Sequence, residues 1–444
     1  MSNLDELKHS MQPTATTPAF DVDQLTGFMA PRPPISRLPA PWEAWEAALD
    51  SAVEGKIQLG DKLGLTSDEK AQSLRWRNNI CQMPIIPTED LSGNAILLRR
   101  AHVVLTYTMH FYVQSMPPDE AIIIPKSIGI PLLKVSKELD IPPILTFADT
   151  ALYNWDFKPE VQQTEDTIPT PETIRTQTMF TNTKDEEEFY LCSARIELRG
   201  VEVLQLMQVT MNETFIGDAL AVRRITGYLQ KIAHVINELK ALLLDVKRLC
   251  NPDIYYNEVR PWFRGEDSSP NGNKKWIFEA IEDYPDLQPP TELSGPSAGQ
   301  SSMIHVLDIF LGVDHQATSP GQLSFMDRMK SYMPRNHRLF LNHLKANPRP
   351  LRSFVTDAND AELQSAYNHA VTSLKEFRDS HLIIATLYIV GPARRAQKLA
   401  AAYAASNGGA APAEEKAPLK GTGGTDLVKF LKDTRTRTTE TLIQ

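Results

Sequence analysis

Apolar residues recur at helical spacing through most of the chain, whereas the alternation typical of strands is scarce. The clearest example is the segment 217–248, where an apolar residue returns every three or four positions. The same spacing predicts helices over residues 94–116, 187–209, 361–390 and 426–442. We therefore expect a mainly α-helical protein whose largest part is built entirely from helices.

Prolines break the segment 126–146 into short predicted elements, and we place the seam between two domains there. A chain of 444 residues is too long for one compact core, so two domains are the natural expectation. Residues 1–20 are expected to form a disordered tail, 21–140 a small N-terminal domain with its connector, and 141–444 the large helical domain.

The segment 391–427 joins an alanine-rich stretch to a cluster of glycines. Connections of this length are either disordered or act as lids over a site. We expect a mobile loop over 391–425, in which the alanine-rich part is half-helical and the glycine cluster 421–424 is flexible. Thr425 can then cap the final helix.

The composition is that of an ordinary globular protein, with 42% hydrophobic and 23% charged residues and a formal net charge of −9. Such a chain has no basic surface for nucleic acid. The cysteines Cys81, Cys192 and Cys250 form no CxxC pair and favour a reducing compartment. The first twenty residues lack the apolar core of a signal peptide, and the longest apolar run is about half of a membrane span. We expect a cytoplasmic protein that binds neither nucleic acid nor membranes.

His381 stands in the apolar stretch of a predicted helix, where its neighbours three or four positions away are Phe377, Arg378, Ile384 and Ala385. Such a ring is either a core histidine bonded to a backbone carbonyl or the ligand of a metal that needs an apolar surround. A haem is such a group, because one axial histidine suffices to hold it. Arg378 is then either a partner for a haem propionate or a member of a surface ion pair.

Two further groups contain candidate residues, although the signatures GxGxxG, GxxxxGK[ST], HExxH and GxSxG are all absent. Phe189 and Ser193 share one helix face, a pattern that usually means core packing with the serine bonded to the preceding turn. Tyr255 and Tyr256 lie about one turn from Arg260. Either the tyrosines form an aromatic wall and the guanidinium of Arg260 binds a carboxylate, or Arg260 is simply a solvent-exposed basic residue.

Six stretches of the sequence, taken together and in order, match one known family. They are PPILTFADTALYNW at 142–155, FYLCSARIE at 189–197, PSAGQSS at 296–302, MKSYMPRNHRLFL at 329–341, FRDSHL at 377–382 and KGTGGTDL at 420–427. The chain thereby resembles the indoleamine 2,3-dioxygenases, haem enzymes of tryptophan oxidation, in a fungal-type form. The resemblance extends over residues 25–444.

The resemblance implies a small N-terminal α/β domain and a large all-helical domain that holds one haem b. His381 would be the proximal iron ligand, Arg378 a propionate contact, and Arg260 the residue that holds the carboxylate of the amino acid. The other matched positions are Phe189 and Ser193 in the distal pocket, Phe147 beside the indole, Ser297 and Ala298 in the loop at the haem edge, and Gly421, Thr422, Gly423 and Gly424 in the mobile loop over the substrate.

The implied activity is insertion of O2 across the indole C2–C3 bond of L-tryptophan, giving N-formylkynurenine in the kynurenine pathway of tryptophan catabolism. An electron donor would keep the iron ferrous. No side chain stands out as a general base, and Ser193 is expected to tune the pocket or hold a water.

Two positions depart from the family's pattern, since Tyr255 replaces a phenylalanine and Pro296 a glycine. A tyrosine brings a polar group into an apolar slot, and a proline stiffens the loop at the haem edge. Because of these two replacements, the protein could instead be a dioxygenase that acts on a different indole, or a haem protein that only binds O2. A third alternative is a helical interaction protein without a cofactor.

Overall fold

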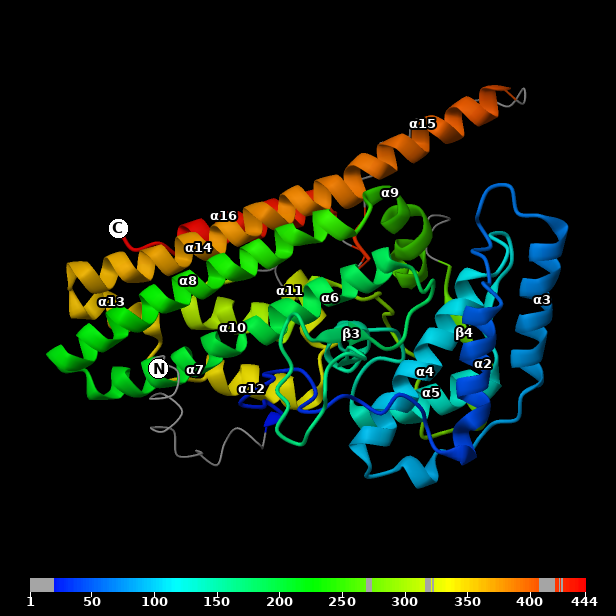
Figure 1. Ribbon diagram of the computed structural model, residues 1–444, viewed down its shortest axis with the longest axis horizontal. Coiled ribbons are helices and arrows are strands. Elements are labelled where there is room, and N and C mark those ends of the chain that lie inside the picture. Colours follow the sequence, from blue (N-terminus) through cyan, green and yellow to red (C-terminus); the bar gives the residue numbers. More distant parts are fainter. Residues whose placement is uncertain are drawn as a thin grey trace.

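The computed structural model describes residues 20–268, 274–315, 321, 323–406, 420–422, 424 and 426–444. Most of these residues are helical, so the mainly α-helical fold expected from the hydrophobic spacing is confirmed (Figure 1). The helices are α2 (Glu43–Glu54), α3 (Ser67–Gln82), α4 (Ala95–Gln114), α5 (Lys126–Leu139), α6 (Lys184–Arg199), α7 (Val201–Ile216), α8 (Ala219–Leu249), α9 (Pro252–Ile254), α10 (Ser302–Leu311), α11 (Phe325–Lys330), α12 (Arg335–Lys345), α13 (Leu351–Ala358), α14 (Ala361–Ala385), α15 (Gly391–Ser406) and α16 (Leu427–Glu440).

The strands within the described residues are only three residues long and form two separate pairs. They are β1 (Ile122–Ile124), β2 (Trp155–Phe157), β3 (Ile174–Thr176) and β4 (Trp276–Phe278). β1 pairs in parallel with β4, with Ile122 opposite Trp276, and β2 pairs antiparallel with β3. The strands tie loops together rather than form a layer of the fold.

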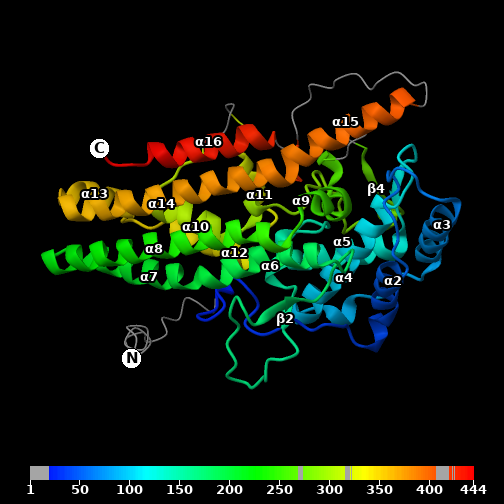
Figure 2. The same ribbon diagram turned by 45° about the horizontal axis from the view of Figure 1, so that its top comes forward.

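The long helix α8 forms the spine of the helical part. Asp218 caps its first turn by accepting a hydrogen bond from the Ala221 amide at 2.7 Å. Its buried stripe packs against α14, α7 and α6, while α16 lies along α14 (Figures 1 and 2). The stripe consists of Ile225, Leu229, Ile232, Ile236, Leu239 and Leu243.

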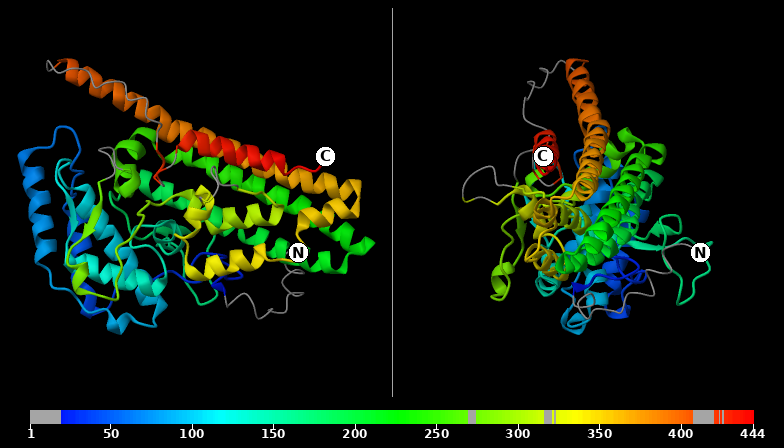
Figure 3. Two further views of the ribbon diagram at one scale, coloured as in Figure 1. Left: turned by 180° about the vertical axis from the view of Figure 1, so that it is seen from behind. Right: turned by 90° about the vertical axis from the view of Figure 1, so that its left-hand side faces the viewer.

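The helices α2 to α5 pack on one another at one end of the molecule (Figures 1 and 3). Their strand β1 takes its partner β4 from residues 276–278, far beyond residue 140. The N-terminal part thus contains helices and one strand pair whose second member is contributed from later in the chain. The division into two domains at residue 140 stays a prediction.

The expectation of short, proline-broken elements over 126–146 is wrong for α5, a helix of 14 residues that contains Pro131. A proline inside a helix costs about 3 kcal/mol because one hydrogen bond is lost. Burial outweighs this cost, since each buried aliphatic side chain contributes roughly 1.5–3 kcal/mol. The buried aliphatic side chains are Ile128, Ile130, Leu132, Leu133 and Val135.

The alanine-rich part of 391–425, predicted to be half-helical, lies in α15, a helix of 16 residues, while the mobility of the segment stays a prediction. The helix α15 follows α14 almost without a break and extends away from the body of the molecule (Figures 1 and 3). Alanine has the highest helix propensity, which favours a helix even without a packing partner. Residues 407–419 lie outside the described residues, so the expectation for them is not tested.

Other predictions about chain ends fall partly outside the described residues as well. These include the tail, of which only Phe20 is described, and the proposed cap Thr425. The observed cap of α16 is Asp426, whose carboxylate accepts a hydrogen bond from the Lys429 amide at 3.1 Å. Among the described residues, no helix combines the length and the apolar character that a bilayer-spanning segment needs.

Candidate functional site

His381 lies on α14 with buried apolar residues one turn before and one turn after it. Its ring borders two adjoining cavities, and neither ring nitrogen has a hydrogen-bond partner among the described residues. Burial, helped by repulsion from Arg378, lowers the pKa of His381 to about 4. At neutral pH the imidazole is therefore uncharged and has a free lone pair. The alternative, a core histidine bonded to a backbone carbonyl, is not supported, because His381 forms no such bond among the described residues.

The two cavities have volumes of about 160 Å³ each. We call them the Arg378 cavity and the Tyr255 cavity, after a residue that borders only one of them. Their shared walls are mostly apolar and come from α6, α14, α16 and the loop before α10. The shared residues are Phe147, Phe189, Ser193, Ala298, Gly299, His381, Ile384, Tyr388, Phe430 and Leu431.

The helix α6 places Phe189 and Ser193 on the same face, toward both cavities, as their spacing indicated. The ring of Phe189 lies 4.3 Å from the ring of Tyr255, measured between centroids. Phe147 borders the same space from the turn that precedes residues 148–152. The structure thus gathers three aromatic side chains of the predicted site around one cavity.

Arg378 borders the first cavity but already has two protein partners. Its guanidinium donates to the Asp308 carboxylate in α10 and to the Thr438 hydroxyl in α16. Burial alone would raise the pKa of Asp308, but Arg378 and His315 hold it below its usual value. Arg378 therefore ties three helices together at the cavity wall, and its contact with a propionate stays a prediction.

Arg260 follows a wide helical turn formed by residues 255–259 and is buried. Its Nη2 donates to the Lys420 carbonyl at 2.9 Å, while its Nε has no partner. No carboxylate pairs with it among the described residues. Burial lowers the pKa of Arg260, which reflects the cost of keeping this charge unpaired. The side chain does not itself border either cavity, but Tyr255 does.

The loop at residues 295–297 and the segment 420–422 are hydrogen-bonded to each other beside the Tyr255 cavity. The Gly295 amide donates to the Thr422 carbonyl at 3.1 Å, and the Thr422 hydroxyl donates to the Pro296 carbonyl at 2.6 Å. Gly421, Thr422 and Pro296 all border this cavity. The two predicted loops, one at the haem edge and one over the substrate, are thus in direct contact.

Three other residues of these two loops are predicted to belong to the site, namely Gly423, Gly424 and Ser297. Gly423 lies outside the described residues. Gly424 has a φ of 76°, and a Cβ there would lie 2.3 Å from Asp267 Oδ2, so only glycine fits. Ser297 borders the Tyr255 cavity and accepts a hydrogen bond from the Gly299 amide at 3.2 Å.

Sequence reasoning missed two buried polar residues at this site. Glu197 borders the Arg378 cavity and accepts a bond from Ser301 Oγ at 2.6 Å, while burial raises its pKa to about 7. Gln300 accepts from the Phe147 amide at 2.8 Å and donates to the Gly295 carbonyl at 2.9 Å. The spacing of Glu197, four residues after Ser193, could have revealed it, whereas the role of Gln300 depends on contacts distant in sequence.

Comparison with known proteins identifies the family of this chain. A profile of the family described as Indoleamine 2,3-dioxygenase matches residues 16–441. Indoleamine 2,3-dioxygenase of Saccharomyces cerevisiae is 31% identical over 420 residues, which cover 86% of this chain and 90% of that protein.

Two other relatives cover nearly the whole chain. Indoleamine 2,3-dioxygenase 1 of Rattus norvegicus is 27% identical, covering 96% of this chain and 95% of its own length. A 6-hydroxytryptophan 2,3-dioxygenase of Fusarium equiseti is 30% identical, covering 95% and 97% respectively. The chain therefore belongs to the indoleamine 2,3-dioxygenase family and is an oxidoreductase, as its motifs suggested.

Proposed function

We propose that this protein inserts both atoms of O2 across the indole C2–C3 bond of L-tryptophan and releases N-formylkynurenine. One observation carries the proposal: a neutral, unpartnered imidazole, His381, borders an apolar space lined by aromatic rings. Relatives that cover most of the chain are named indoleamine 2,3-dioxygenases, which supports the proposal. The reaction would consume O2 and need an electron donor to keep the iron ferrous.

The residues around His381 fit a haem. His381 would hold the haem through its iron, because a single histidine from the protein suffices for this. His381 offers a free nitrogen for that purpose, and the apolar walls on both sides exclude water. Arg378 borders one cavity, and a propionate would meet its guanidinium there beside the existing bonds to Asp308 and Thr438. When bound, the haem would supply the oxygen chemistry, which no side chain of this site can perform.

The Tyr255 cavity fits the amino acid. Phe147, Phe189 and Tyr255 supply flat surfaces for an indole ring. Arg260 is bonded to Lys420, whose neighbour Gly421 borders this cavity. The guanidinium carries a buried positive charge that no carboxylate pairs with among the described residues. The guanidinium can hold the substrate carboxylate in one of two ways. Either its hydrogen bond to the Lys420 carbonyl breaks, or its unpaired Nε rotates toward the cavity.

The protein's own contribution is to bind, orient and keep the substrate dry. The segment 420–422 closes one side of the cavity through Thr422. Ser193 borders the space, but a serine hydroxyl is too weak an acid or base to drive the reaction. Glu197 borders only the Arg378 cavity and is bonded to Ser301, so we assign it no proton transfer with the substrate.

A hydroxylated indole is a second candidate substrate. The Tyr255 hydroxyl has no hydrogen-bond partner in the described part of the chain, although the residue borders the cavity. An unpaired phenol can bond to a polar substituent that tryptophan lacks. One relative is named a 6-hydroxytryptophan 2,3-dioxygenase. An oxygen-binding protein without turnover is less well supported, because it has no use for the unpaired Arg260.

Replacing the iron ligand tests the haem assignment. His381→Ala should purify without a stoichiometric haem, because no other unpartnered imidazole borders the cavities among the described residues. The haem-to-protein ratio after reconstitution measures this. His234→Ala is the matched control, since the His234 side chain is 73% exposed and should leave the ratio unchanged. A full haem complement in His381→Ala would falsify the assignment.

Removing the buried guanidinium tests the carboxylate anchor. Arg260→Gln should raise the KM for L-tryptophan about ten-fold or more, because one charge-assisted bond is lost. Steady-state kinetics at equal haem loading measure this change. Arg264→Gln is the control, since Arg264 is already paired with Asp61 at 2.6 Å. An unchanged KM in Arg260→Gln would show that another group holds the carboxylate.

The choice between the two substrates depends on Tyr255. Tyr255→Phe should lower kcat/KM for 6-hydroxytryptophan relative to L-tryptophan by about five- to ten-fold, as expected for one lost hydrogen bond. Competition between the two substrates in one reaction gives the ratio directly. If the ratio does not move, the hydroxyl of Tyr255 plays no part in substrate selection.

A further inference from the structure

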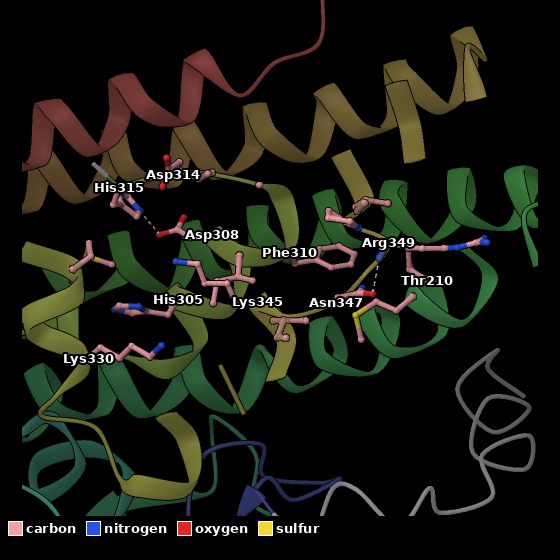
Figure 4. A pocket seen from close by; sticks show the side chains of 18 of the residues that line it. Thr210, His305, Asp308, Phe310, Asp314, His315, Lys330, Lys345, Asn347 and Arg349 are labelled. Atoms are coloured by element: carbon pink, nitrogen blue, oxygen red, sulfur yellow. Dashed lines mark hydrogen bonds and ion pairs between the residues drawn. The ribbon is translucent and has the colours of Figure 1, made fainter. Parts of the chain in front are cut away.

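A third cavity lies between α10, α11, α12 and the turn at residues 347–350, with α7 on the far side (Figure 4). Its volume is about 320 Å³, compared with about 160 Å³ for each of the two cavities at His381. Met326 borders both this cavity and the Arg378 cavity, and Asp308, which borders this cavity, binds Arg378, so the two spaces adjoin each other. The proposed dioxygenase activity makes no use of this space.

Cationic side chains from three segments line this cavity. Lys330 ends α11, Lys345 ends α12, and Arg349 lies in the following turn (Figure 4). None of the three pairs with a carboxylate among the described residues. Lys330 donates to the Asn342 side chain at 2.5 Å, and Arg349 donates to the Thr214 carbonyl at 2.7 Å. Both contacts use uncharged acceptors, so no direct ion pair neutralises these charges, although the Asp327 carboxylate partly offsets the charge of Lys330 from a distance.

The two lysines also lie close enough to affect each other. Burial lowers the pKa of Lys330, and the nearby charge of Lys345 lowers it further. Two like charges at one wall repel each other, and an anion between them would relieve that repulsion. The cavity therefore has a place where negative charge is favoured.

The acidic residues at the wall do not cancel this preference. Asp308 is bound by Arg378 and by His315 Nε2 at 2.7 Å. Asp327 accepts from Ser324 Oγ at 2.6 Å and lies in the first turn of α11, where the helix dipole stabilises it. Asp314 is exposed and lies away from Arg349 in the view of Figure 4.

Part of the wall is apolar, beside polar residues such as Thr210 and Asn347, and this part fits a ligand with a hydrophobic body. Met211, Phe310, Met326 and Leu344 border the space. An apolar cavity of about 150 Å³ holds a benzene molecule, so this cavity has room for a substituted ring. A bare inorganic anion would leave the apolar wall uncovered.

We propose that this cavity binds a small organic carboxylate, with the carboxylate between Lys330 and Lys345 and an apolar body against Phe310 and Met211. The site shares no lining residue with the Tyr255 cavity proposed for the substrate, so it would accept its ligand whether or not the dioxygenase substrate is bound.

Isothermal titration calorimetry of the full haem-loaded chain with benzoate tests the proposal, with neutral benzamide as the matched probe. Benzoate should bind and benzamide should bind about ten-fold more weakly, because the amide cannot form charge-assisted bonds with the lysines. The double variant Lys330→Gln with Lys345→Gln should weaken benzoate binding about ten-fold or more. Lys432→Gln, which changes an exposed lysine on α16, should leave benzoate binding unchanged.

Two further outcomes separate this site from the proposed substrate pocket. Arg260→Gln should retain benzoate binding, because Arg260 is not part of this cavity. If Arg260→Gln abolishes binding while the double lysine variant keeps it, benzoate occupies the substrate pocket and the proposal is wrong. It is equally wrong if benzamide binds as tightly as benzoate, or if benzoate does not bind. Thermal melting of each variant confirms that it is folded.

Discussion

The packing of α14 against α8 determines where His381 points, and the rest of the site depends on that direction. α14 carries buried apolar residues before and after the histidine, and α8 and α16 cover the helix on two sides. With this face fixed, the ring borders the apolar space instead of water or a backbone carbonyl. A neutral imidazole without a partner is costly in a core, and it becomes useful only when another group takes its lone pair.

A second constraint comes from contacts between segments far apart in the chain. Gln300 joins Phe147 to Gly295, and Thr422 joins the segment after residue 419 to Pro296. The aromatic wall, the loop before α10 and the segment before α16 are therefore positioned together. Pro296 takes part through its carbonyl, which a proline retains, so a proline at this position is compatible with the contact to Thr422.

Helical spacing predicted most of the helices, because a buried stripe repeats along each of them, as in α8 and α14. It failed at α5, where burial outweighs the cost of Pro131, and over 187–209, where the chain forms two helices, α6 and α7, that meet at Gly200. His381 could be identified as a candidate because its neighbours along one helix are apolar. Gln300 and the cavity at Lys330 could not, since both arise from segments that are distant in sequence.

The most direct test of the proposed activity is to give the reduced, haem-loaded protein L-tryptophan and oxygen labelled with the heavy isotope, and to analyse the product by mass spectrometry. We predict N-formylkynurenine that carries two labelled oxygen atoms, because the indole C2–C3 bond is cleaved and each of its carbons receives one atom of O2. A protein that shows a histidine-ligated haem spectrum but forms no such product, or a product with one labelled oxygen, would contradict this prediction.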